Sequence, residues 1–386
     1  MSSGTYSVTA YGSMIRAEPR MTAYSRALRH AITPGCTVLD LGAGFGFFAI
    51  LACSYGAGRV VAVEPAESIQ LGTEMARANG CADQIDFVQG LSSDLAADNQ
   101  FDVIIADLRG CLPLFKRHIP VIIDARQRLL KPGGTLVTQR DTLCAALVSD
   151  NKICEKTHVP WRSNDYNVDL STGSQFAVNH PHRNDMKPGM LFSDVGEIAV
   201  LDYRTITDPN VSGKVSLTAH HDATAHGFAA WFDAELCDGR GFSTAPDAPP
   251  LVYGQMFFPF KDPIELEKDD RVEIDIDFQL VGDEYVKTWR TRRISASPDA
   301  PEIRFVQSST LAEVTSIDTL RRRSGGYAPP PHPRHELDRH CLQRFDGETK
   351  LETIALELME MDSERFEDTS DALRYVAALA ERYHLG

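Results

Sequence analysis

The sequence lacks the features that would place it in a membrane or among disulfide-bonded secreted proteins. No apolar run approaches the roughly 18 residues that a membrane-spanning helix needs. The N-terminus, MSSGTYSVTA, has neither the basic start nor the apolar core of a signal peptide. The eight cysteines form no C-x-x-C pair, which argues against a structural zinc site and a disulfide framework. We therefore expect a cytoplasmic protein with reduced, buried cysteines and no bound metal.

The chain also lacks an excess of positive charge. Its formal net charge is −15, which argues against non-specific binding to nucleic acid or to an anionic membrane. The contents of 43% hydrophobic and 24% charged residues are typical of a globular protein. A chain of 386 residues is too long for one ordinary core, so we expect two or three domains.

Two kinds of pattern divide the chain. Between residues 36 and 140, strand-like and helix-like runs alternate, which predicts a mostly parallel sheet covered by helices. Between 195 and 295, strand-like runs are separated by turns, and residues 271–281 alternate apolar and polar as a half-buried antiparallel strand does. The predicted fold is an α/β Rossmann-like sheet, then an antiparallel β-barrel, then a small helical domain. The predicted domains are N-terminal helices at 1–30, the sheet domain at 31–140, the barrel at 141–320, a Pro- and Gly-rich linker at 321–335 and the helical domain at 336–386.

The strongest local motif is VLDLGAGFGFFAI, in which a buried strand runs into a glycine-rich turn and a helix. Gly42, Gly44 and Gly46 allow the backbone to approach a ligand, and the helix offers free N–H donors. The spacing G-x-G-x-G differs from the G-x-G-x-x-G of dinucleotide enzymes. Asp40 before the turn suits a cationic amine, and Glu64 at the end of the next strand suits a pair of ribose hydroxyls.

These features in this order, with a later K-P-G-G turn, resemble the class I S-adenosylmethionine-dependent methyltransferases. The resemblance implies that S-adenosyl-L-methionine is the cofactor. The residues that we expect to bind it are Tyr11, Met14, Arg20, Asp40, Gly42, Ala43, Gly44, Gly46, Glu64, Pro65, Leu91, Ser92 and Asp107.

Further motifs resemble the protein arginine methyltransferases over about residues 5 to 295. MIRAEPRMTAYSRAL is similar to the family's N-terminal pattern M-L-x-D-x-x-R-x-x-x-Y, although Ala17 replaces its aspartate. That match implies that Arg20 holds the carboxylate of the cofactor. AHGFAAWFDAEL resembles a barrel segment of the family, and WRSNDYNVDL resembles the segment that leads into its dimerisation arm. We therefore expect a homodimer formed through residues near 165–195.

The sequence departs from the family where the family binds its acceptor. The family's loop carries two glutamates nine positions apart, whereas this chain has Asp107 and Lys116. The family's T-H-W triplet is replaced by residues 251–253, Leu-Val-Tyr, and Gln255 is kept. Arginine stays cationic at neutral pH, so a lysine at about 4 Å would cost on the order of 4 kcal/mol at an effective dielectric constant of about 20.

Three interpretations of this loop remain open. Asp107 can act as a base or orienting group for a different acceptor, with Tyr253 and Gln255 as contacts from the barrel. Arg109 and Lys116 can bind an anionic acceptor such as a carboxylate. Alternatively, Asp107 pairs with Arg109 and Lys116 extends into solvent. The predicted catalytic residues are Asp107, Arg109, Tyr253 and Gln255.

The C-terminal domain weakly resembles the small winged-helix domains that recognise leader peptides in ribosomal peptide maturation. Such a domain would hold a peptide substrate. The sequence fits slightly better a domain that packs on its own barrel or on a second subunit. Thr349 and Glu352 have the spacing of a capping box at the start of a helix.

The sequence as a whole predicts a methyltransferase that acts on a non-standard nitrogen or oxygen acceptor of a peptide, protein or small metabolite. A true protein arginine N-methyltransferase is the first alternative. A protein that binds the cofactor without catalysis is the second.

Overall fold

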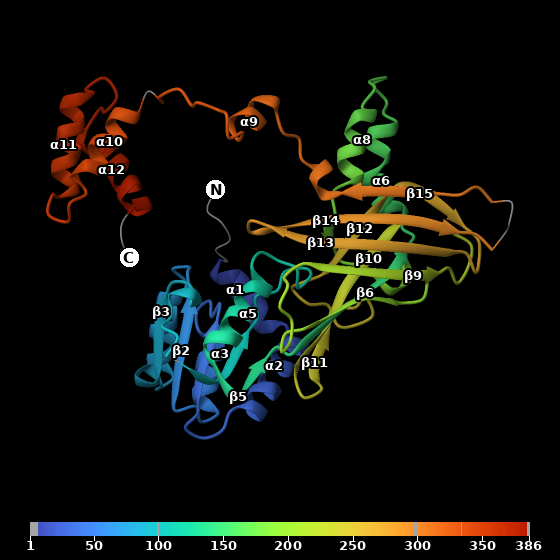
Figure 1. Cartoon of the computed structure of the whole chain (residues 1–386), viewed down its shortest axis with the longest axis horizontal. Coiled ribbons are helices and arrows are strands. Elements are labelled where there is room, and N and C mark those ends of the chain that lie inside the picture. The colour runs from blue at the N-terminus through green and yellow to red at the C-terminus, as the bar shows by residue number, and fades with distance from the viewer. Residues whose placement is uncertain (1–6, 99, 297–299, 333, 384–386) are drawn as a thin grey trace. The chain divides into compact units, whose positions relative to one another are not determined.

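The computed structural model describes residues 7–98, 100–296, 300–332 and 334–383. The chain divides into two compact units, Met1–Val314 and Thr315–Gly386 (Figure 1). The first unit begins with helices α1, Val8–Arg16, and α2, Glu18–Ala31. The side chain of Ser7 caps α1, and a proline in the first turn of α2 suits the start of a helix.

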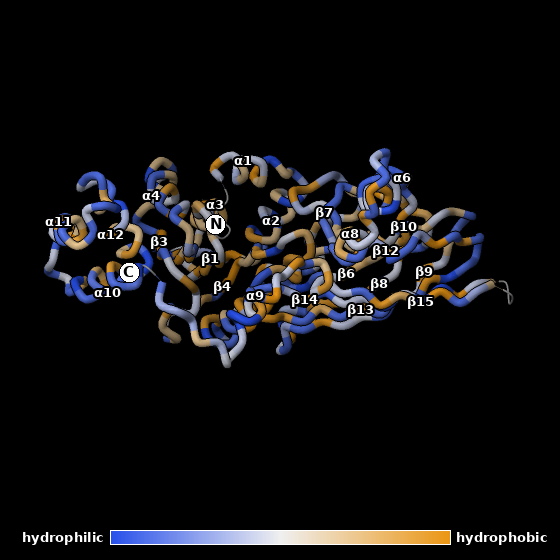
Figure 2. The backbone as a smooth tube through the Cα atoms, turned by 90° about the horizontal axis from the view of Figure 1, so that it is seen from above, coloured by the Kyte–Doolittle hydropathy of each residue, from blue (hydrophilic) through white to orange (hydrophobic). Residues whose placement is uncertain are grey.

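A five-stranded parallel sheet follows, with strand order β3-β2-β1-β4-β5. Its strands are β1, Thr37–Leu41; β2, Arg59–Glu64; β3, Ile85–Gln89; β4, Phe101–Ala106; and β5, Leu130–Val137. Its helices are α3, Phe47–Ser54; α4, Ile69–Ala78; and α5, His118–Arg128. The central strands β1 and β4 are mostly hydrophobic, as expected for strands covered on both faces (Figure 2).

After β1 the chain adds β2 and β3 on one side of that strand, and then adds β4 and β5 on its other side. The strand order therefore reverses between β1 and β4, which lie next to each other in the sheet. In open sheets of this kind, ligands bind outside the carboxyl ends of the strands at such a switch point. The glycine turn follows β1, and Asp107 follows β4. The topology therefore brings the two strongest sequence motifs to one crevice.

Two antiparallel sheets form the second half of this unit (Figure 1). One has the order β7-β12-β10-β6-β8, with β11 paired to β10, and the other has the order β15-β14-β13-β9. Residues 271–281 form β13, in which Val272, Ile274, Ile276 and Phe278 are buried, so the predicted alternation is confirmed. The remaining strands are β6, Arg140–Val148; β7, His182–Asn184; β8, Gly196–Asp202; β9, Val211–Thr218; β10, Ala223–Cys237; β11, Arg240–Ser243; β12, Gln255–Leu266; β14, Glu284–Ile294; and β15, Arg304–Ser308.

Three short helices, α6, Asn151–Thr157, α7, Val159–Arg162, and α8, Ser171–Val178, are inserted between β6 and β7. They occupy the part of the sequence that resembles the dimerisation arm. Tyr166 is 84% exposed and Val168 is 54% exposed. This insertion therefore presents apolar side chains to solvent.

The second unit is helical over its described residues. Its helices are α9, Ile317–Arg322; α10, His335–Arg344; α11, Leu351–Met361; and α12, Thr369–Tyr383. Cys341, Ile354, Leu358 and Val376 are fully buried in a core of their own. Between Thr315 and Tyr383 the described residues form no strand, so this part contains no hairpin that could serve as a wing.

The predicted capping box at α11 is wrong. Helix α11 starts at Leu351 after Lys350, and no side chain caps it. The hydroxyl of Thr349 instead donates to Asp346, whose carboxylate also accepts the backbone N–H of Glu348. The hydroxyl of Thr349, which was expected to cap the helix, is therefore hydrogen-bonded to Asp346 of the D-G turn instead.

The predicted fold class is confirmed: a Rossmann-like sheet, antiparallel barrel strands and C-terminal helices follow one another along the chain. Within the part of the chain that the structure describes, no helix has both the length and the apolar character needed to cross a membrane.

Candidate active site

A cavity of about 580 Å³ opens at the switch point of the parallel sheet. It is bounded on one side by the glycine turn and the ends of β2 and β3, and on the other by the loop after β4 and by barrel residues. The predicted cofactor residues that line it are Tyr11, Met14, Arg20, Asp40, Gly42, Ala43, Gly44, Glu64, Pro65, Leu91, Ser92 and Asp107. The cavity is therefore the candidate site for both cofactor and acceptor.

The glycine turn needs glycine for two reasons. Gly42 and Gly44 have φ values of 64° and 60°, in the left-handed region that side chains rarely adopt. A Cβ on Gly44 would also lie 2.7 Å from the ring of Tyr11. Gly46 does not line the cavity, but with φ of 81° it precedes the first residue of α3 and packs against Phe87. Gly46 therefore helps to shape the turn, and its predicted contact with the cofactor stays a prediction.

Two carboxylates stand at this end of the cavity. Glu64 accepts the backbone N–H of Gly44 at 3.1 Å and that of Ala66 at 3.0 Å, which fixes its orientation and leaves lone pairs for further donors. Asp40 is fully buried and accepts the N–H of Ala49 in the first turn of α3 at 3.0 Å. Burial raises the pKa of Asp40 from 3.8 to about 7. A cationic amine nearby would favour its ionised form.

Aromatic rings enclose the same end. Tyr11 from α1 packs edge-on against Phe45 of the glycine turn, with ring centroids 5.1 Å apart. Phe47 and Phe48 also line the cavity. Glycine backbone, a carboxylate at the end of β2, a buried aspartate and aromatic rings together fit a nucleoside with a cationic amino-acid tail. The residues present therefore fit S-adenosylmethionine.

Arg20 and Asp107 form a buried ion pair between α2 and the loop after β4. The Nε of Arg20 donates to Asp107 Oδ2 at 2.8 Å, and a second guanidinium nitrogen contacts the same oxygen. The hydroxyl of Tyr253 donates to Asp107 at 2.9 Å and accepts from Arg20 Nε at 2.9 Å. Arg20 lines the cavity, and its predicted contact with the cofactor carboxylate stays a prediction.

Arg109 has a different principal partner from the one expected. Its Nε and NH2 each donate to Asp141 of β6 at 2.8 Å, and the side chains of both residues are fully buried. Its NH1 donates to the hydroxyl of Tyr24 at 2.9 Å and to Asp107 at 3.3 Å. Arg109 lines the cavity, but its guanidinium nitrogens already donate to Asp141, Tyr24 and Asp107, and its predicted contact with an anionic acceptor stays a prediction.

The charges of this network are mutually balanced. Burial alone would raise the pKa of Asp107, but Arg20 and Arg109 hold it below its ordinary value. Burial, together with Asp107, raises the pKa of Tyr253 well above its ordinary value. Asp107 therefore stays ionised and has little tendency to take a proton, so it is a poor general base in this arrangement.

The network continues through Asp141, Tyr203 and His118, which the sequence did not single out, and of these His118 lines the cavity. Tyr203 donates to Asp141 at 2.7 Å, and His118 at the start of α5 lies 3.0 Å from the Tyr203 hydroxyl. Burial, then the charge of Arg109, lowers the pKa of His118 to about 3, so this imidazole is neutral. An aspartate early in the hydrophobic strand DTLCAALV was the one available signal, since a buried carboxylate requires a cationic partner.

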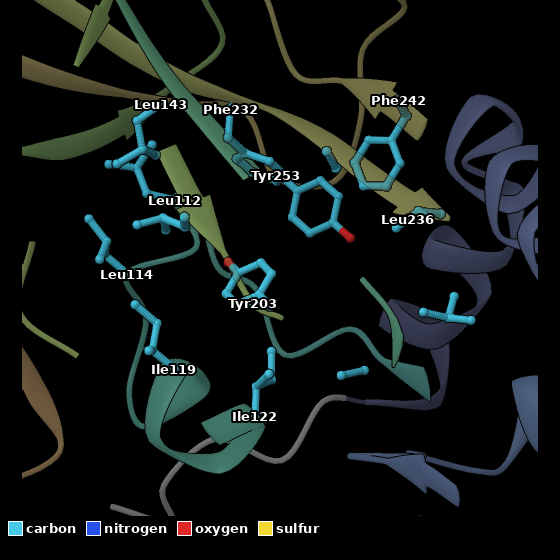
Figure 3. Close-up of a cluster of buried hydrophobic side chains, with 14 of the residues drawn as sticks. Leu112, Leu114, Ile119, Ile122, Leu143, Tyr203, Phe232, Leu236, Phe242 and Tyr253 are labelled. Atoms are coloured by element: carbon cyan, nitrogen blue, oxygen red, sulfur yellow. The ribbon is translucent and has the colours of Figure 1, made fainter. Parts of the chain in front are cut away.

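The loop after β4 is anchored by its own leucines. Leu112 and Leu114 are buried against Ile119 of α5 and Leu143 of β6 (Figure 3). Lys116, three residues before Ile119, lines the cavity and has φ of 45°, an uncommon conformation for a residue with a side chain. Its ammonium lies 5.4 Å from the ring centre of Phe115. The described residues supply no carboxylate in ion-pair contact with it.

The two predicted barrel contacts have different places. Tyr253 lines the cavity, and its ring stacks on Phe242 at 5.8 Å between centroids (Figure 3). Gln255 does not line it. Its amide accepts the N–H of Met186 at 2.7 Å and donates to the carbonyl of Thr244 at 2.7 Å. The prediction that Gln255 contacts the acceptor is therefore not supported, because its amide holds barrel backbone together.

Away from the cavity, His30, Cys237 and Asp238 form the one group of three potential metal ligands found among the described residues, with ligand atoms within 4.8 Å of one another. His30 and Asp238 are exposed, and a hydrogen bond of 2.8 Å joins them.

Comparisons with known proteins agree with this geometry. Residues 32–171 match the model of a methyltransferase domain, and residues 139–285 match the arginine methyltransferase oligomerization subdomain. The chain is 26% identical over 306 residues to a probable protein arginine N-methyltransferase 6 of Arabidopsis thaliana, covering 67% of this chain and 70% of that protein. It is 26% identical over 284 residues to protein arginine N-methyltransferase 1 of Dictyostelium discoideum, covering 70% and 83%.

Solved structures share the fold. The PRMT1 enzyme–prozyme complex of Trypanosoma brucei aligns with a TM-score of 0.71 and 18% identity, over 77% of this chain and 97% of that one. Protein arginine methyltransferase 10 of Arabidopsis thaliana aligns with a TM-score of 0.70 and 20% identity, over 79% and 97%.

The fold and the cavity thus define a class I methyltransferase that uses S-adenosylmethionine. Within that class, the chain is an enzyme that resembles the protein arginine methyltransferases in both its sheet domain and its barrel.

Proposed function

We propose that this enzyme transfers the methyl group of S-adenosylmethionine to a nitrogen or oxygen of a peptide, protein or small molecule that is not a cationic guanidinium. The observation that carries the proposal is the state of Asp107. Its two oxygens already accept hydrogen bonds from two cations, Arg20 and Arg109, and from Tyr253, so an incoming third cation would have to displace one of these donors.

The second position of the loop supports the same conclusion. A guanidinium clamp needs two carboxylates, because bidentate contacts orient the acceptor nitrogen. Lys116 stands at the second position and lines the cavity. A cationic acceptor beside it would meet repulsion on the order of 4 kcal/mol at about 4 Å with an effective dielectric constant of about 20.

In this proposal the bound cofactor supplies an activated methyl group. The glycine turn and Glu64 bind the cofactor, and the aromatic rings near α1 exclude water from it. The Arg20–Asp107–Tyr253 cluster holds α2, the loop after β4 and the barrel in fixed positions. The chain's contribution is therefore mainly alignment of donor and acceptor.

Arginine N-methylation is the second candidate, and the comparisons favour it over the first. The relatives named above are called protein arginine N-methyltransferases. For this chain to act in that way, the acceptor would have to displace Arg20 from Asp107 and approach Lys116.

The experiment uses the full chain, methyl-labelled S-adenosylmethionine and a cell lysate separated into protein, peptide and small-molecule fractions. Labelled products are hydrolysed in acid, and methylarginines are separated from all other labelled compounds. Glu64→Ala serves as the variant with a damaged cofactor site.

Label in compounds other than methylarginine, lost in Glu64→Ala, supports the proposal. Label confined to methylarginine contradicts the proposal and supports arginine N-methylation. Absence of label in every fraction, with S-adenosylhomocysteine still bound by the protein, contradicts both.

We also propose that the chain forms a homodimer through the insertion that contains α6, α7 and α8. The exposed Tyr166 and Val168 support this interface, because large apolar side chains grouped on a surface favour association. Analytical ultracentrifugation of the wild type and of Tyr166→Ser tests the proposal. A monomeric wild type contradicts it.

A further inference from the structure

The chemistry of the acceptor decides whether methyl transfer needs a base. An amine in its ammonium form or a hydroxyl must lose a proton, so a group within hydrogen-bond reach has to accept it. A carboxylate is already ionised at neutral pH and offers a lone pair directly. The presence or absence of an available base beside the acceptor therefore distinguishes these acceptor classes.

The described residues that line the cavity include three carboxylates, Asp40, Glu64 and Asp107. Asp40 and Glu64 lie at the glycine turn, where the cofactor fits. Asp107 is saturated by two arginines and a tyrosine. His118, the one histidine among these lining residues, is committed to Tyr203 and stays neutral. The acceptor side thus offers no free base in the described part of the chain.

The same side of the cavity is rich in cations. Lys116, Arg117 and Arg183 line it together, on the loop before α5 and on β7. Arg117 and Arg183 have exposed partners, Asp283 at 3.7 Å and Asp185 at 3.1 Å. Neither of these aspartates is among the lining residues.

Lys116 is distinguished from its two neighbours by having no such partner. It is half-buried, and the described residues place no carboxylate in ion-pair contact with it. Its backbone adopts φ of 45°, in the left-handed region that residues with a side chain rarely adopt. A half-buried cation in a cavity is stabilised when an anion enters beside it.

Arg183 of β7 lines the same cavity from the barrel. Its Nε donates to the backbone carbonyl of Tyr253 at 3.0 Å, and the hydroxyl of Tyr253 reaches Asp107. Tyr253, which is hydrogen-bonded to the buried network through its hydroxyl, is therefore also hydrogen-bonded to the cavity-lining Arg183 through its backbone carbonyl.

From these contacts we infer that the methyl acceptor is a carboxylate held by Lys116, in a cavity that Arg183 also lines, and that the product is a methyl ester. This inference rests on the proposed function and names its acceptor atom. One carboxylate oxygen forms the new O–CH₃ bond while the S–CH₃ bond of the sulfonium breaks and its electron pair returns to sulfur. No proton moves, so the step needs no base.

The experiment exploits the lability of esters. The full chain is incubated with methyl-labelled S-adenosylmethionine and with two acceptor pools, a peptide library of randomised sequence and a bacterial lysate. Each product is divided, one half is treated with mild alkali, and the volatile labelled methanol is collected. Methyl esters release their label in this way, whereas methyl groups on nitrogen stay in the non-volatile fraction.

Lys116→Ala, Lys116→Glu and the conservative Lys116→Arg are compared with Lys268→Glu, a charge reversal at an exposed lysine outside the cavity. We expect kcat/KM to fall about tenfold in Lys116→Ala and more than about a hundredfold in Lys116→Glu. Lys116→Arg restores most of the activity, because it keeps the charge, and Lys268→Glu matches the wild type. Binding of S-adenosylhomocysteine, measured by calorimetry, is unchanged in all four.

Volatile label that is lost in Lys116→Glu, with binding retained, supports the inference. Label that stays non-volatile after alkali contradicts a carboxylate acceptor, but it still shows that the enzyme transfers methyl groups. Volatile label that is insensitive to Lys116→Glu contradicts the assigned role of the lysine. No label in either pool, with S-adenosylhomocysteine bound, overturns this inference together with the proposed function.

Discussion

The buried pair of Arg109 and Asp141 gives the sharpest test of how the site is held together. Both side chains are fully buried, and two hydrogen bonds of 2.8 Å join them. In Asp141→Asn the shape is kept, but the negative charge and one acceptor oxygen are lost. Arg109 and Arg20, which both already contact Asp107, would then be left with that one carboxylate between them.

The expected loss of stability is large. Removing one partner from a buried ion pair costs about 3–5 kcal/mol, because the remaining charge is left uncompensated in a poorly polarisable interior. The matched control is Asp86→Asn, since Asp86 pairs with Arg59 at 2.8 Å but both side chains are more than half exposed. An exposed pair of this kind contributes about 0–1 kcal/mol.

Urea denaturation followed by tryptophan fluorescence measures the difference. The three tryptophans, Trp161, Trp231 and Trp289, all belong to the first unit, and Trp289 is fully buried, so the signal reports unfolding of the unit that contains the pair. We expect the free energy of unfolding to fall much further in Asp141→Asn than in Asp86→Asn. Equal losses within about 1 kcal/mol would refute the assignment of a buried, mutually compensated network.

Three further predictions concern the cofactor end and the C-terminal unit. Glu64→Ala weakens binding of S-adenosylhomocysteine roughly tenfold or more, because a hydrogen bond to a charged group contributes about 1.5–3 kcal/mol; calorimetry with unchanged affinity would exclude this role. Asp40 holds its proton in the folded state up to a pKa of about 7, whereas the unfolded chain releases it near 3.8. Wild-type stability from this group therefore falls as the pH rises through that window. The stability of Asp40→Asn relative to wild type grows over the same window in urea titrations, and a constant difference would show that the aspartate is not buried. Leu358→Ala leaves a cavity in the helical unit and costs it about 2–5 kcal/mol. Faster hydrogen exchange in α11, without a change in the tryptophan transition, is the expected result, and a shifted tryptophan transition would contradict independent cores.

Much of the fold could be predicted because local patterns specify it. The glycine turn after β1 follows from a buried strand and a turn that requires positive φ, and the carboxylate Glu64 follows from its place at the end of β2. The alternation in β13 follows from one face being buried. Each of these signals lies within about a dozen residues of sequence.

The contacts that decide the chemistry could not be predicted in the same way, because they join distant segments. Asp141 lies 32 positions from Arg109, and Tyr253 lies 146 positions from Asp107. Motif reasoning therefore assigned Arg109 to an acceptor and Gln255 to a barrel contact, whereas the folded chain uses both internally. Lys116 was visible in the sequence only as a departure from a family pattern. Its positive φ, and the absence of a carboxylate in ion-pair contact with it among the residues that the structure describes, required the structure.

Transfer of a methyl group to an acceptor other than arginine is the central claim, and the position of that methyl group in the product tests it most directly. The enzyme is supplied with S-adenosylmethionine carrying a carbon-13 methyl group, the labelled product is purified from lysate, and the methyl group is located by NMR and fragmentation mass spectrometry. The account predicts a methyl group on an oxygen or nitrogen outside any guanidine, absent when Glu64→Ala replaces the wild type. A methyl group on the guanidine of an arginine side chain would contradict it.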